Sequence, residues 1–173
     1  MTAADALTSV RARLAARLPR ERRERVAVAV LLGLVTAGVM LRLAMMLAQR
    51  PAFTGFPDVG TYVDAARTNA FKDPLRPAGY PLFLRLVHLA SAKLSVTIVL
   101  QHALGVATAL LFYAAVRRAG FSRFAALVPA AVVLLSGSQV FLEHTPISEA
   151  LFTFFLAATV YAAARLSQRA SSS

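Results

Sequence analysis

Long apolar runs separated by short polar stretches dominate the chain. Four of these runs are long enough to cross a membrane as α-helices, because a crossing takes about 20 predominantly apolar residues. They cover residues 26–48, 94–116, 124–142 and 147–166. Pro129 is expected to kink the third run, and the small residues Ser136, Gly137 and Ser138 allow close helix contact there.

The stretch between the first two runs, residues 49–93, is too polar to cross. Apolar positions at three-to-four spacing predict a short helix over 58–71 that begins at Asp58 and ends before Pro74. A rigid turn is expected over 76–81, followed by a second amphipathic helix over 82–94. Residues 81–116 as one helix would be about 54 Å long, far beyond a core of ~30 Å. The pattern therefore predicts an all-α integral membrane protein with about four transmembrane helices and two interfacial helices in the first outer loop.

Composition supports this class. Hydrophobic residues make up 58% of the 173 residues, and the mean hydropathy is +0.62. The net charge is +11, but the arginines gather at the ends of apolar runs, which fits orientation in a membrane better than binding of nucleic acid. The chain has no cysteine, so disulfides and thiolate metal sites are excluded.

Positive residues also predict the orientation. Seven lie in 1–25, three in 117–123 and two near the C-terminus, twelve in all, against six in the loop 49–93. The larger group belongs in the cytoplasm. We therefore expect a multi-pass protein of the plasma membrane with both termini cytoplasmic. Its parts are a basic segment 1–25, a helical module 26–166 and a tail 167–173. Within the basic segment, residues 3–20 predict an amphipathic helix on the membrane face, with a solvated tail as the alternative.

This orientation brings the polar residues of the loop and of the turn after the third run to one outer face. Asp58 can act as a general base or cap its helix. Arg76 can bind a lipid-linked phosphate or a lipid headgroup. Glu143 and His144 can bind a divalent cation or simply form a polar turn, and Glu149 suits the start of a helix. His88 and His102 are read as interfacial or packed histidines, and Arg42 either reaches the interface or contacts substrate.

Several of these residues stand in motifs of one family. Asp58 is followed by Tyr62, Ala66 and the string R-P-A-G-Y-P-L-F-L at 76–84. Together with residues 100–118 and with E-H-T-P-I-S-E-A-L-F at 143–152, this resembles the N-terminal part of GT-C membrane glycosyltransferases.

The resemblance implies that the chain moves a sugar from a polyprenyl-phosphate donor to an extracytoplasmic acceptor. Asp58 matches the catalytic base of that family. Arg76, Tyr80 and Glu149 are then expected to contact substrate. Glu143 and His144 match positions that contribute to a metal or substrate site in some members. Membrane lipids are the other expected partners.

Members of that family carry about ten or more spans, so the likeness covers their N-terminal third. We therefore expect a module of a truncated or split enzyme, with a second membrane chain supplying the remaining helices. The alternative is a non-catalytic membrane scaffold or partner subunit. A small four-span transporter is disfavoured, because the acids lie at span ends rather than mid-membrane.

Overall fold

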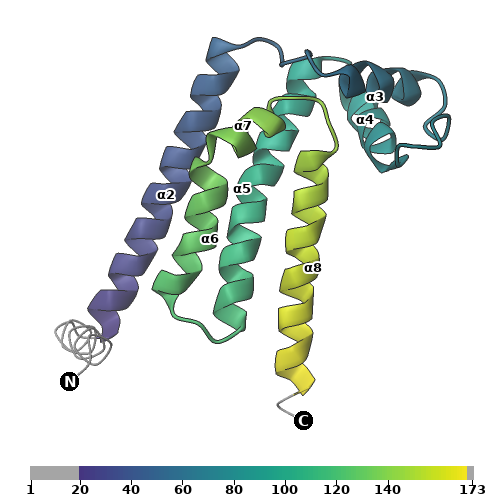
Figure 1. The fold of residues 1–173 in the computed structure, drawn as a ribbon. Helices are drawn as coiled ribbons and strands as arrows, with labels where there is room; N and C mark the ends of the chain where they lie inside the picture. The colour runs from purple at the N-terminus through teal and green to yellow at the C-terminus, as the bar shows by residue number, and fades with distance from the viewer. Residues whose placement is uncertain (1–19, 171–173) are drawn as a thin grey trace, which may run out of the picture.

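The computed structural model of the chain describes residues 20–170, which form seven α-helices and no strand (Figure 1). Three helices are long and apolar enough to cross a membrane: α2 (Arg20–Ala48), α5 (Leu94–Arg118) and α8 (Glu149–Ala170). A fourth crossing is possible if α6 (Arg123–Leu135) and α7 (Gly137–Glu143) are one span, bent by 55°. The predicted all-α membrane fold is confirmed, whereas the amphipathic helix predicted for 3–20 lies outside the described residues.

The central helix of the bundle is α5, which packs against both α6 and α8, while α2 packs against α6. Ala109, Ala130 and Leu134 form the buried core between these helices, with Leu34 and Val35 of α2 packed against it. The first turn of α2 and the last turn of α8 lie at one end of the bundle (Figure 1). The polar connection after α2 and the short helix α7 lie at the opposite end, which we call the loop end.

The bend in the third apolar run is not where the sequence predicted it. Helix α6 continues through Pro129 and ends at Leu135. The break comes at Ser136, whose hydroxyl accepts a hydrogen bond from the backbone N–H of Gln139 at 3.3 Å and so caps α7. A serine cap supplies a partner for a free N–H at a new helix start, and this favours a break there.

Two short helices form at the loop end, as predicted, with shifted bounds. Helix α3 (Pro57–Arg67) ends earlier than expected. Helix α4 (Gly79–Ala90) begins inside the stretch predicted as a rigid turn. Residues 91–93 separate α4 from α5, which confirms that the two cannot be one helix. Helices α3 and α4 pack against each other and against Ile147, which lies two residues before the start of α8.

Candidate functional site

The carboxylate of Asp58 lies at the surface of the loop end, in an ion pair with Arg76. Nη2 and Nε of Arg76 both donate to Oδ1 of Asp58, at 2.6 and 3.2 Å, and Nη1 donates to Asp73 at 2.6 Å. Asp58 does not cap α3, because Phe56 occupies the N-cap position and makes no side-chain cap. The Asp58 side chain remains 50% exposed, so the carboxylate can meet a ligand.

The three charges influence one another. Hydrogen bonds to Asp58 and then to Asp73 raise the pKa of Arg76, which stays a cation. The hydrogen bond from Arg76 and one from the backbone of Leu75 lower the pKa of Asp73 below its ordinary value. The structure thus brings together two of the predicted site residues, Asp58 and Arg76.

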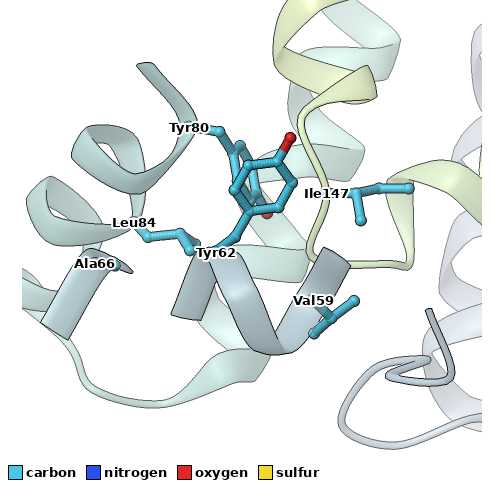
Figure 2. Packing of buried hydrophobic residues seen from close by; sticks show 6 residues of the cluster. All are labelled: Val59, Tyr62, Ala66, Tyr80, Leu84 and Ile147. Carbon is cyan, nitrogen blue, oxygen red and sulfur yellow. The ribbon is translucent and has the colours of Figure 1, made fainter. Parts of the chain in front are cut away.

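Two tyrosines dock the loop helices onto the bundle (Figure 2). The rings of Tyr62 and Tyr80 pack edge to face with centroids 5.0 Å apart, and the Tyr62 hydroxyl lies 3.2 Å from Oγ of Ser148. Tyr80 is only 2% exposed, and its hydroxyl donates to Oε1 of Gln101 at 2.6 Å. Burial, with smaller effects from Glu149 and Tyr62, raises the pKa of Tyr80. Tyr80, predicted to contact substrate, lies in the core and its hydroxyl already has a partner.

Gln101 of α5 connects this tyrosine to the turn after α7. Its amide nitrogen donates to the backbone oxygens of Glu143 and Thr145, at 3.0 and 2.7 Å. Its amide oxygen accepts from Tyr80, and the side chain has no exposed surface. A buried amide with both of its ends satisfied fixes the relative position of the elements that it joins.

Glu143 and His144 do not face solvent. The carboxylate of Glu143 is fully buried and forms a bidentate ion pair with Arg42 of α2, with Nη2–Oε1 and Nε–Oε2 distances of 2.7 and 2.8 Å. Gln139 donates to Oε1 at 3.2 Å. Arg42, for which an interfacial or substrate-contacting position was predicted, is 3% exposed and lies inside the bundle.

A row of imidazoles continues from this carboxylate. Nδ1 of His102 lies 3.0 Å from Oε2 of Glu143, and its Nε2 lies 3.2 Å from Nδ1 of His144. Nε2 of His144 then lies 2.7 Å from the backbone oxygen of Gln49. Burial lowers the pKa of His144 and favours its neutral form, in which one ring nitrogen donates a hydrogen bond and the other accepts one.

The donors around Glu143 do not fit a divalent metal ion. Both carboxylate oxygens already accept hydrogen bonds from the guanidinium of Arg42, whose positive charge repels a second cation at the same place. Both ring nitrogens of His144 face other partners. Among the residues that the structure describes, no group of three His, Asp or Glu side chains is placed to hold a metal.

The remaining predicted groups lie apart from this cluster. Glu149 is exposed in the first turn of α8, where the helix dipole favours a carboxylate. His88 lies with Arg67, Arg85 and apolar side chains of α4 along a groove of about 680 Å³ between α3 and α4 residues. Of the predicted site residues, Asp58, Arg76 and Glu149 are therefore exposed or half-exposed, whereas Glu143 and His144 belong to the buried network.

Sequence reasoning missed the importance of Arg42 and Gln101 and took His102 for a packed histidine. The signal was present, because polar and charged residues inside apolar runs are expensive unless they pair with one another. Arg42 lies within the first apolar run and Glu143 ends the third. Because the two residues carry opposite charges and lie near the ends of their apolar runs, the sequence could have suggested that they pair.

This combination of apolar crossings and a docked polar loop defines an integral membrane protein with an accessible carboxylate–guanidinium pair at one end of its bundle. Residues 95–173 match the model of the dolichyl-phosphate-mannose-protein mannosyltransferase family, a GT-C family. No curated protein and no solved structure matches the chain. The match confirms the resemblance to GT-C glycosyltransferases and supports a membrane glycosyltransferase as the class of the protein. It covers α5 to α8 but not the loop that carries Asp58 and Arg76.

Proposed function

We propose that this chain is the N-terminal module of a membrane glycosyltransferase that moves a sugar from a polyprenyl-phosphate donor to an acceptor outside the cytoplasm. One observation carries the proposal. The loop that bears Asp58 is docked, through Tyr80 and Gln101, onto the turn at Glu143–Thr145, which lies within the segment matched by the family model. Mannose is the first sugar to test, because the matched family is named for it.

Asp58 is the proposed general base. Within the described residues no hydrogen bond reaches its Oδ2, since Arg76 uses Oδ1 alone. Oδ2 is free to take the proton of an acceptor hydroxyl while the acceptor oxygen bonds to the anomeric carbon. The bond from that carbon to the phosphate oxygen breaks, and the lipid phosphate leaves with the electron pair. The sugar configuration is inverted.

Arg76 is the proposed phosphate contact. A guanidinium binds phosphate oxygens in a bidentate manner, and Arg76 stays charged at any physiological pH. Glu149 is exposed at the start of α8, and its carboxylate is proposed to accept a hydrogen bond from a substrate hydroxyl. We propose no step through a metal ion, because the buried donors do not fit one.

The test is sugar transfer from radiolabelled polyprenyl-phosphate mannose by membranes that contain the chain, alone and with any membrane chain that co-purifies. Asp58→Asn is expected to lower the rate by about 100-fold or more, the usual contribution of a general base. Asp64→Asn is the matched control, since Asp64 lies on the same helix with a similar side-chain exposure, 57% against 50%. Transfer at the parent rate by Asp58→Asn would refute the base assignment.

The membrane orientation is part of the proposal and has its own test. The chain has no native cysteine, so single cysteines report their surroundings without background. Lys72→Cys, at an exposed site in the loop, should react with an impermeant maleimide added outside intact cells. Phe121→Cys, exposed in the connection between α5 and α6, should react only after the cells are opened. The reverse pattern would place both termini outside.

The second candidate is a non-catalytic scaffold or partner subunit. It is favoured by the exposed apolar side chains along α8, which include Phe152, Phe155 and Leu166. These side chains can face lipid or the helices of a second chain. A preparation that transfers no sugar alone or with its co-purified partner, in which Asp58→Asn leaves the partner's own activity unchanged, would favour this candidate.

A further inference from the structure

We infer that Arg42 is a positioning residue for the proposed reaction: it fixes the turn at residues 143–145, to which both ends of the loop bearing Asp58 and Arg76 are tied. The inference rests on the proposed function for its catalytic meaning. Its structural part stands on contacts alone and can be tested without any sugar transfer.

The first step is the position of the guanidinium at the broken end of α6. Because that helix stops at Leu135, its last carbonyl groups lack the partners that a continuing helix would provide. Nη1 of Arg42 donates to the carbonyl oxygen of Leu134 at 2.9 Å, and Nη2 lies 3.4 Å from that of Val133. A cation at a helix C-terminus is also favoured by the helix dipole. Arg42 therefore stabilises the break itself.

The second step is that every N–H group of the Arg42 guanidinium already has a hydrogen-bond partner. Its remaining N–H groups donate to Gly38 of its own helix at 3.0 Å and to both carboxylate oxygens of Glu143. All five donors are therefore in use, and a guanidinium presents them in a rigid planar fork. One side chain of α2 thus sets the distance between the end of α6 and the last residue of α7.

The third step concerns how helix α5 accommodates the carboxylate of Glu143. Gly105 of α5 has no side chain, and a Cβ built there would overlap the carboxylate of Glu143. His102, one turn earlier on α5, contacts the same carboxylate. Glu143 is therefore held from α2 and α5 together, and the direction in which the chain leaves α7 is fixed.

The fourth step connects the turn to the loop at both of its ends. At the start of the loop, the backbone N–H of Phe53 donates to the carbonyl oxygen of His144 at 3.1 Å, and the His144 ring contacts the carbonyl oxygen of Gln49. At the far end, Gln101 joins the carbonyl oxygens of the turn to Tyr80, four residues after Arg76. The same three-residue turn thus ties the loop on either side of Asp58.

The experiment measures the position of the loop relative to the bundle. Spin labels are placed at Arg67→Cys on α3 and at Phe121→Cys, both exposed and outside the network, and their distance distribution is recorded by pulsed EPR in lipid nanodiscs. Arg42→Lys keeps the charge but has only three donors for five acceptors, so the width of the distribution should at least double. Glu143→Gln should do the same. Arg50→Lys, exposed two residues beyond the end of α2, is the matched control and should leave the width unchanged.

An unchanged width in both Arg42→Lys and Glu143→Gln would overturn the inference. Where transfer activity is measurable, Arg42→Lys should lower kcat by up to about 100-fold, as expected for a misplaced catalytic group. The KM for the donor should change by less than about threefold, because the groups that bind it are still present. If Asp58→Asn retains full activity while the spin-label distance distribution still broadens in Arg42→Lys, the proposed function fails and the positioning role of Arg42 stands. An Arg42→Lys variant that loses kcat but keeps the parent width of the distance distribution would refute the positioning role.

Discussion

Arg42 and Glu143 are 101 residues apart in the chain, and their side chains meet in a fully buried, bidentate ion pair. The two residues come from different apolar segments, α2 and α7, so the pair joins the first crossing to the bent pair of helices α6 and α7. Around it, His102, Gly105 and Gln139 satisfy or enclose the carboxylate. The pair is thus part of the architecture that supports the loop end.

The first prediction concerns the stability that depends on this pair. Glu143→Gln leaves an uncompensated guanidinium in a buried site, and loss of one partner of a buried ion pair costs about 3–5 kcal/mol. We expect a loss of that size in the free energy of unfolding, measured by SDS titration in mixed micelles with circular dichroism. Lys72→Gln breaks the exposed pair with Asp64 and is expected to cost at most about 1 kcal/mol. Equal losses of unfolding free energy in the two variants would show that the buried pair contributes no more to stability than the exposed one.

The second prediction uses the glycine that faces this carboxylate. Gly105→Ala places a methyl group where the Glu143 carboxylate lies, and overpacking of this kind costs about 1–3 kcal/mol. Gly33→Ala is the matched control, because a Cβ at that helical position has no atom within 4 Å. It should leave stability unchanged or slightly higher, since alanine favours helix over glycine. Unfolding in the same micelles measures both, and a stable Gly105→Ala would contradict the close fit.

The crossings were predictable because they depend on local properties of the sequence. Length and apolar content alone identify a span, and α2, α5 and α8 all fall on predicted runs. The separation of α4 from α5 followed from simple length, as a continuous helix could not fit a membrane. The two loop helices followed from their periodic apolar positions, although their ends were displaced by several residues.

The buried network was not predictable in the same way, because it depends on contacts between distant segments. Glu143 and His144 were expected at a surface with solvent and ligands. In the structure, Arg42 and His102 come from other helices and bury both residues. The sequence placed Asp58 and Arg76 at one face correctly, since both belong to the same loop, but their direct contact depends on how α3 and α4 pack together.

The third prediction concerns the bend after α6. Ser136→Ala removes the oxygen that caps α7, and the loss of a serine cap costs about 1 kcal/mol. Ser138→Ala, at an exposed serine two residues later with no side-chain hydrogen bond among those described, should have no effect. Pro129→Ala should leave the bend in place, because α6 already continues through Pro129. Spin-label distances across the bend would test this, and a straightened Pro129→Ala variant would restore the proline explanation.

The fourth prediction is a pH dependence of the loop. The pKa of Asp73 is lowered in the folded state, so its stabilising contribution is complete above the ordinary aspartate value of about 3.9 and is lost as pH falls through the lowered value. The charged groups at this contact are Asp58, Asp73 and Arg76. A spin label at Arg67→Cys should therefore keep constant mobility from neutral pH to about pH 4 and loosen below it. Arg76→Gln should weaken the acid transition and move it to higher pH, with the Leu75 hydrogen bond to Asp73 remaining, whereas Lys72→Gln should leave it unchanged.

The last prediction separates docking of the loop from chemistry in it. Tyr80→Phe removes only the hydroxyl that donates to Gln101, and leaves a buried amide oxygen without its partner. This costs about 1–3 kcal/mol in unfolding free energy. Tyr113→Phe is the control, since Tyr113 is a partly buried tyrosine of α5 with no hydroxyl hydrogen bond among those described.

The two possible roles of Tyr80 give different kinetic results. If Tyr80 acts by docking α4, Tyr80→Phe should broaden the spin-label distance between α3 and the bundle and lower kcat, with little change in the KM for the lipid donor. If its hydroxyl instead contacts substrate, as the family resemblance implied, KM should rise while the distance distribution stays narrow. The buried position of Tyr80, 2% exposed, leads us to expect the first result.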